Sequence, residues 1–156
     1  MSQQVGPNAG AAGPPAVVLD TNVVLDWLVF RDHRVAPLAG AISQGRLRWL
    51  ATPRMRRELA SVLGRDDLLA WKVDEARVLA AAEQYAQPCA EPPPCVLHCA
   101  DRDDQVFIDL ALAHSAHWLV THDKALLRLA RAARSHGTVV CRPEEWAWTA
   151  DPAARP

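Results

Sequence analysis

The sequence predicts an α/β fold in which a central parallel sheet of about five short strands is flanked by helices on both faces. The first observation is that short apolar runs alternate along the chain with segments of helical periodicity. The second is that these runs are apolar at successive positions, as expected for strands buried on both sides. The third is that 50% of the 156 residues are hydrophobic, which suffices for the core of one domain.

The first part of the chain is predicted to fold as a strand, two helices and a second strand. Residues 16–19 are apolar and rich in β-branched side chains, which indicates a buried strand. Residues 22–29 and 35–44 have helical patterns, and Gly45 ends the second helix. Residues 47–51 form the next apolar run, and we expect the second strand there.

The middle of the chain is predicted to be helical. Thr52 as N-cap and Pro53 in the first turn mark the start of a helix that runs to Leu63. Residues 66–71 are predicted to form a short helical segment. Residues 73–87 are predicted to form an amphipathic helix, because their apolar side chains recur on one face.

Strands and helices alternate again after the proline-rich segment EPPP. The apolar run 95–99 is predicted to be a strand, and residues 104–115 the following helix. Residues 118–120 are predicted to be the next strand, and residues 125–136 a helix that is ended by a glycine. Residues 138–141 complete the predicted sheet.

The folded domain is predicted to span residues 16–148. Residues 1–15 are interpreted as a disordered leader and residues 149–156 as a flexible tail. A formal net charge of -1 provides no global basic field, so any surface that binds nucleic acid must be local. The sequence has no signal peptide and no apolar run long enough to span a membrane, so we expect a cytoplasmic protein without membrane contact.

The cysteines are most simply free thiols in a reducing compartment. Cys89, Cys95, His98 and Cys99 lie close together in the sequence, which raises the possibility of zinc. The group lacks paired CxxC spacing, so a zinc site is disfavoured.

Acidic side chains follow the predicted strands. Asp20 and Asp123 come directly after strands, Asp104 opens a helix, and Glu58 lies two turns into another helix. The carboxyl ends of parallel strands share one edge, so these carboxylates should converge and repel one another unless a cation neutralises them. Hard oxygen ligands suit Mg²⁺ or Mn²⁺. The alternative is that each acid only caps a helix or forms a turn.

Several segments resemble those of PIN-domain nucleases, in the branch that contains the toxins of toxin–antitoxin pairs. The opening strand and helix are VVLDTNVVLDWL, and the second acidic helix is PRMRRELASVLGR. The third and fourth acidic stretches are joined in DRDDQVFIDLALAHSAHWLVTHDKALLRL, and the closing segment is RPEEWAW. The resemblance covers roughly residues 16 to 147. It implies a PIN-like fold and a Mg²⁺- or Mn²⁺-dependent endoribonuclease, with an antitoxin protein as partner and a homodimer as assembly.

The resemblance also implies which residues carry the activity. The residues that match the family's metal-binding and catalytic acids are Asp20, Glu58, Asp104 and Asp123, with Asp101 in reserve. The residues expected to orient these acids are Thr21, Asn22 and Thr121. The chain departs from the family where Arg102 replaces a common proline and where His122 replaces a small residue, but neither change removes an acid. His122 could contact a phosphate or only line its loop, and the second interpretation is favoured. Asp26 and Asp109 are interpreted as solvated or structural residues.

Basic side chains near the acids are candidates for contacts with RNA phosphates. Arg54 and Arg57 flank Glu58 on its predicted helix, and Lys124 follows Asp123. The alternative is an ordinary charged helix face.

Two other functions compete with the nuclease. An aspartate-based phosphotransferase of haloacid-dehalogenase type would use Asp20 as nucleophile and Lys124 to bind phosphate. That loop requires a second Asp where Asn22 stands, so this function is disfavoured. A PIN-like module that binds RNA or protein without catalysis is disfavoured because all the expected acids are present.

Overall fold

The computed structural model describes residues 13–150. The greater part of the predicted leader, residues 1–12, and residues 151–156 of the predicted tail lie outside the described residues. Arg48 holds the start of the described chain, because its backbone N–H donates to the Pro15 carbonyl at 2.9 Å and its Nε to the Pro14 carbonyl at 2.8 Å.

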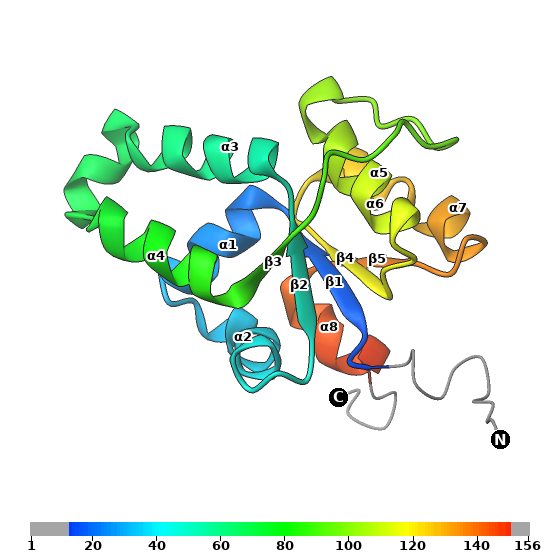
Figure 1. The fold of residues 1–156 in the computed structure, drawn as a ribbon, viewed down its shortest axis with the longest axis horizontal. Helices are drawn as coiled ribbons and strands as arrows, with labels where there is room; N and C mark the ends of the chain where they lie inside the picture. Colours follow the sequence, from blue (N-terminus) through cyan, green and yellow to red (C-terminus); the bar gives the residue numbers. More distant parts are fainter. Residues whose placement is uncertain (1–12, 151–156) are drawn as a thin grey trace, which may run out of the picture.

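A five-stranded parallel sheet forms the centre of the molecule, with strand order β3-β2-β1-β4-β5 (Figure 1). The strands are β1 (Ala16–Leu19), β2 (Arg48–Ala51), β3 (Ala86–Pro88), β4 (Trp118–Val120) and β5 (Val139–Cys141). All pairs are parallel, so the carboxyl ends of the strands lie at one edge. The chain leaves β1 toward β2 on one side and later returns to β4 on the other, which makes the β1–β4 boundary the switch point where ligands usually bind in such sheets.

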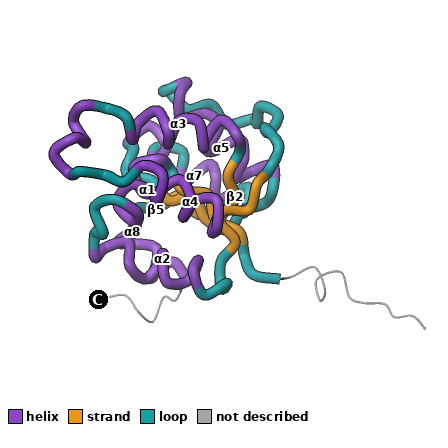
Figure 2. The backbone as a smooth tube through the Cα atoms, turned by 60° about the vertical axis from the view of Figure 1, so that its left-hand side comes forward, coloured by secondary structure: helices purple, strands orange, loops and turns teal. Residues whose placement is uncertain are grey.

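Helices cover both faces of the sheet (Figure 2). The helices on one face are α1 (Thr21–Leu28), α2 (Ala36–Ser43), α3 (Pro53–Leu63), α4 (Glu75–Tyr85) and α8 (Pro143–Ala150). The helices on the other face are α5 (Gln105–Ala113), α6 (Lys124–Leu127) and α7 (Ala130–Arg134). Short 3-10 helices occur at His33–Val35, Asp66–Trp71 and Arg102–Asp104.

Strand β1 shows why the runs of apolar residues predicted this arrangement. Val17 and Leu19 pack against the helices of one face, whereas Ala16 and Val18 pack against those of the other. Successive residues of a strand point to opposite sides, and helices cover both sides of this sheet, so all these side chains are buried. The predicted α/β fold with helices on both faces is therefore confirmed.

The predicted strand at residues 95–99 is wrong. The third strand is instead Ala86–Pro88, at the end of the segment predicted as the helix 73–87, and it pairs with the outer side of β2. Pro88 is tolerated there because β3 is an edge strand. Residues 95–99 lie over α5, whose side chains take up their backbone hydrogen bonds. The Cys95 N–H donates to Asp109 Oδ1 at 2.9 Å, and the Cys99 N–H donates to Gln105 Oε1 at 2.7 Å.

Other differences concern element ends. The predicted helix 125–136 is two helices, α6 and α7, with the chain turning between Leu127 and Ala130. The predicted helix 104–115 begins one residue later, because Asp104 belongs to the preceding 3-10 turn. Helix α8, which closes the fold, was not predicted as a helix. No helix within residues 13–150 is both long and apolar enough to cross a bilayer.

Candidate functional site

Asp20 ends β1 at the switch point and is held on both carboxylate oxygens. Its Oδ1 accepts the Asn22 N–H at 3.1 Å at the start of α1, and its Oδ2 accepts the Thr121 hydroxyl at 2.6 Å. Thr121 follows β4 and is fully buried, so this contact joins the ends of the two central strands. The same Thr121 oxygen accepts the Asp123 N–H at 2.9 Å. Burial raises the pKa of Asp20, whose side chain is only 4% exposed, and the charges of Asp123 and Glu58 act in the same direction.

Glu58 is positioned by helix α3 and by Thr21. Thr52, which is buried, caps α3 by accepting the Met55 N–H at 3.2 Å. Glu58 lies one turn farther along the helix, and its Oε2 accepts the Thr21 hydroxyl at 2.5 Å. Two of the predicted orienting residues therefore act through their hydroxyls on Asp20 and Glu58, whereas Asn22 acts through its backbone N–H.

A group of three carboxylates lies beside Asp20. Asp101, Asp104 and Asp123 each offer an oxygen, and these oxygens lie within 4.8 Å of one another. It is the only such group of Asp, Glu, His or Cys found within residues 13–150. Asp101 accepts the Asp103 N–H at 2.9 Å, and Asp123 caps α6 through the Ala125 N–H at 2.7 Å. Both acids are thus fixed by backbone donors of their own turns.

Asp104 is the most strongly perturbed acid of the group. Burial raises the pKa of Asp104 to about 8, and its contact with Asp123 together with the charges of Asp20, Asp123 and Asp101 acts in the same direction. The contact with Asp104 lowers the pKa of Asp123, which α6 backbone donors also favour in its charged form. The Oδ2 atom of Asp104 is buried and has no hydrogen-bond partner.

The donor chemistry of this group suits a hard divalent cation. Carboxylate oxygens are the preferred ligands of Mg²⁺ and Mn²⁺. A buried carboxylate oxygen without a partner, such as Asp104 Oδ2, is costly unless a ligand satisfies it. The residues present therefore fit a divalent cation bound by the three carboxylates next to Asp20.

The predicted phosphate-binding residues are exposed and are neighbours of Glu58 and Asp123 in the sequence. Arg54 and Arg57 are exposed on α3, and Lys124 is exposed at the first position of α6. Within the described chain, none of their side chains takes part in an ion pair.

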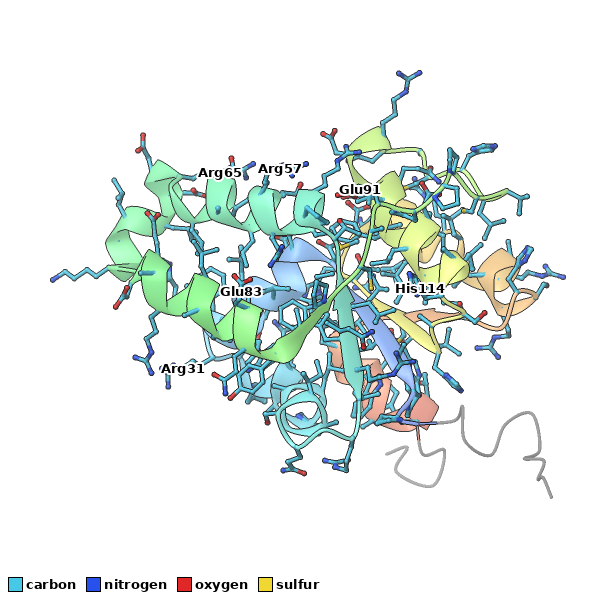
Figure 3. All side chains as sticks on the ribbon, viewed as in Figure 1. Arg31, Arg57, Arg65, Glu83, Glu91 and His114 are labelled. Atoms are coloured by element: carbon cyan, nitrogen blue, oxygen red, sulfur yellow. The ribbon has the colours of Figure 1, made fainter. Side chains whose placement is uncertain are left out.

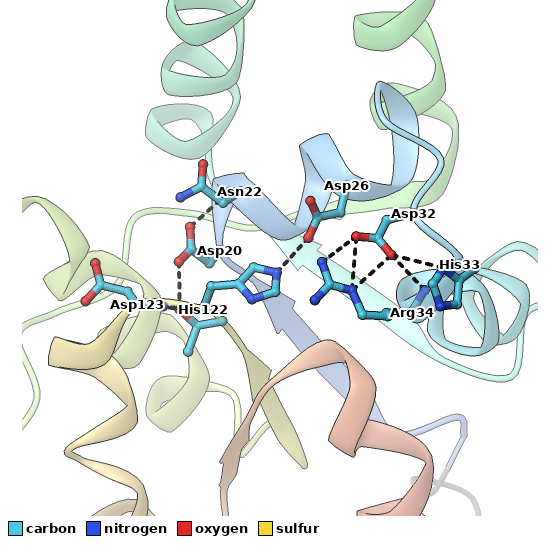
Figure 4. A network of polar contacts seen from close by, with 9 residues as sticks. Asp20, Asn22, Asp26, Asp32, His33, Arg34, His122 and Asp123 are labelled. Carbon is cyan, nitrogen blue, oxygen red and sulfur yellow. Dashed lines mark hydrogen bonds and ion pairs between the residues drawn. The ribbon is translucent and has the colours of Figure 1, made fainter.

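A histidine–carboxylate pair lies beside the acids and was missed as a unit by sequence reasoning. His122 Nε2 lies 2.6 Å from Asp26 Oδ2, which joins the loop after β4 to helix α1 (Figure 4). Asp26 and His122 are 96 positions apart, and no sequence pattern relates them. The interpretation of Asp109 as structural agrees with its buried carboxylate, which is bound to Cys95 and Gln105.

Solved structures with low sequence identity share this fold. A chain of VapBC2 from Rickettsia felis, in a structure bound to a DNA fragment from their promoter, has a TM-score of 0.57 at 11% identity, covering 80% of this chain and 96% of that chain. PAE2754 from Pyrobaculum aerophilum has a TM-score of 0.56 at 20% identity, covering 97% of this chain and 100% of that chain.

Sequence comparison places the chain in a family. No curated protein sequence matches it. The family described as PIN domain matches residues 16–125, from the first residue of β1 to the start of α6. This match includes all the acids that meet at the carboxyl edge of the sheet. The chain therefore belongs to the PIN-domain family.

Proposed function

We propose that this protein is a Mg²⁺- or Mn²⁺-dependent endoribonuclease. PIN domains are generally metal-dependent nucleases, and this chain carries the acidic group that such an activity requires. The observation that carries the proposal is the convergence of Asp101, Asp104 and Asp123 within 4.8 Å beside the buried Asp20. We assign metal binding to Asp20, Glu58, Asp104 and Asp123, with Asp101 as an additional ligand.

The chain's own residues prepare this site for phosphodiester hydrolysis. A bound divalent cation lowers the pKa of water and neutralises charge on a phosphate oxygen. Thr121 and the Asn22 N–H hold Asp20, and Thr21 holds Glu58, so that little reorganisation is needed when substrate binds. One of the carboxylates accepts the proton of the attacking water. Arg54, Arg57 and Lys124 bind phosphates of the RNA, because their side chains are exposed and follow or precede Glu58 and Asp123 closely in the sequence.

We further propose that the protein is the toxin of a toxin–antitoxin pair. The fold it shares with a chain of the VapBC2 complex supports this role. An antitoxin protein would then be its partner, a homodimer its assembly and the cytoplasm its location. The phosphotransferase alternative loses its basis with the PIN-domain match, whereas a binding module without catalysis remains an outcome of the experiment below.

The proposal is tested by titrating Mn²⁺ into the purified protein with a pool of fluorescent RNA hairpins. We expect the wild type to cut only with metal present, and Asp20→Asn to cut at least about 100-fold more slowly, since essential groups of a hydrolytic site contribute that much. Asp103→Asn is the control variant. Asp103 lies in the turn that carries Asp101 and Asp104, but it is outside the acidic group. Equal rates for the wild type and Asp20→Asn would refute the nuclease. Wild-type protein that binds RNA but does not cut it even with Mn²⁺ present would favour the binding module.

A further inference from the structure

We propose that a groove lined by Arg54, Arg57 and Arg102 is a second anion-binding site. It holds phosphates of the RNA substrate that neighbour, in the same strand, the phosphate being cut. This inference rests on the proposed function and extends it to the path of the substrate. It adds Arg102, the residue that departs from the family pattern in the third acidic stretch.

The groove lies between the start of α3 and the turn that precedes α5. It is a cavity of about 470 Å³, to which α3 contributes Arg54 and Arg57 and the 3-10 turn contributes Arg102. In Figure 3, Arg57 lies on the side of α3 toward Glu91, which lines the same cavity, whereas Arg65 lies beyond the end of α3. Arginines from two elements that are far apart in the sequence therefore line one recess.

The guanidinium groups of this groove are free to bind a ligand. All three arginines are exposed, and no ion pair involves them within residues 13–150. Their neighbour Arg56 is different, because it pairs with Glu83 at 2.7 Å on the other side of α3. Unpaired guanidinium groups bind phosphate oxygens in pairs of parallel hydrogen bonds.

Within the described chain, neither acid of the groove, Glu91 or Asp109, forms an ion pair with these arginines. Glu91 Oε2 accepts the backbone N–H of Arg54 at 2.9 Å and so caps the start of α3. Asp109 is buried, and its Oδ1 accepts the Cys95 N–H and the Gln105 side chain, both at 2.9 Å. Each carboxylate is thus engaged in holding the walls of the groove.

The position of the groove favours a chain of phosphates over an acidic peptide. Arg102 stands between Asp101 and Asp104 in the sequence, and Arg57 directly precedes Glu58, so the segments that line the groove also carry acids of the site. An acidic peptide and an RNA strand would meet the same repulsion from these acids, but only RNA is a substrate of the proposed nuclease, whose cation would offset that repulsion. In an RNA strand, one phosphate lies at the cation while its neighbours contact the arginines.

The test is RNA binding in EDTA, where no cleavage takes place. Fluorescence anisotropy of a labelled oligouridine is measured against salt concentration for the wild type, Arg102→Ala and Arg57→Ala. Each variant should bind about 5- to 10-fold more weakly at low salt, with the slope of log affinity against log salt reduced by about 0.7, the value for one phosphate contact on a single strand. Arg102→Lys should retain the slope, and Arg65→Ala, an exposed arginine outside the groove, should match the wild type.

The groove and the proposed nuclease can fail separately. If the wild type cuts RNA and Arg102→Ala and Arg57→Ala retain its affinity, salt slope and KM, the groove proposal is overturned and the nuclease stands. If the wild type does not cut RNA with Mn²⁺ present, but RNA binding in EDTA depends on these arginines, the groove stands and the nuclease falls. Competition by polyglutamate as effective as that by unlabelled oligouridine would overturn the assignment to phosphates. In an active enzyme, the loss in Arg102→Ala should appear in KM rather than in kcat.

Discussion

At the scale of single residues, the site depends on acids that are held in place yet kept close to one another. Asp20 is buried and accepts two hydrogen bonds, from Thr121 and from the Asn22 N–H. Asp104 is surrounded by other carboxylates and has one buried oxygen without a partner. Such an arrangement is unfavourable for the fold alone and is typical of functional sites.

The raised pKa of Asp104 predicts a pH dependence of stability. Asp104 has a pKa of about 8 in the folded protein against 3.8 in the unfolded chain, so the folded state binds more protons between these values. The stability that this group contributes is present at low pH and is lost as the pH rises toward 8. Asp104→Asn should therefore be more stable than the wild type above pH 8, by about 1 kcal/mol. Metal-free thermal unfolding from pH 4 to pH 9 measures this, and parallel curves for the two proteins would contradict it.

At the scale of elements, helix α5 and the segment before it act together. Gln105 donates to the Leu97 carbonyl at 2.8 Å and accepts the Cys99 N–H at 2.7 Å, while Asp109 receives the Cys95 N–H. These contacts replace the strand that the apolar run 95–99 predicted. They also fix the chain just before Asp101, which joins the acidic group.

We therefore predict that Gln105→Ala weakens metal binding through Asp101. Removing the Gln105 amide frees the segment before Asp101, and loss of such outer contacts lowers metal affinity by about tenfold. Mn²⁺ affinity is measured by calorimetry in the wild type and in Asp101→Asn. The effect of Gln105→Ala should shrink in the Asp101→Asn protein, because the residue it positions is no longer a ligand. An equal loss in both proteins would show that Gln105 supports only the fold. Gln84→Ala is the control, because Gln84 is an exposed residue of α4.

At the scale of the whole molecule, the acidic edge joins segments from both halves of the sheet. Asp20 follows β1, Glu58 comes from α3 after β2, and Asp123 follows β4. Thr121 and the His122–Asp26 pair tie the end of β4 to β1 and α1. A cation held there would link elements that are far apart in the sequence.

Bound metal is accordingly predicted to stabilise the entire fold. At about 100 times its Kd, a cation that binds only the folded state adds about 2.7 kcal/mol to the free energy of unfolding. Urea unfolding with Mn²⁺ and with EDTA measures this gain, which Asp104→Asn should largely abolish and the control Asp103→Asn should retain. Identical midpoints with and without Mn²⁺ in the wild type would refute a metal site at this edge.

Local patterns in the sequence were sufficient for most of the fold and for the location of the acids. The apolar runs at residues 16–19 and 118–120 predicted buried strands, because only residues covered on both sides are apolar at successive positions. Acids that follow such strands must meet at one edge, since parallel strands end together. Asp20 and Asp123 were placed at that edge by this reasoning.

Only the tertiary structure decided how the remaining groups pair. The short edge strand at 86–88 forms because β2 offers it a partner, and the run 95–99 stays out of the sheet because α5 binds its backbone. The Thr121–Asp20 contact spans 101 positions, and the His122–Asp26 contact spans 96. Such contacts leave no periodicity in the sequence, because they depend on where whole elements pack.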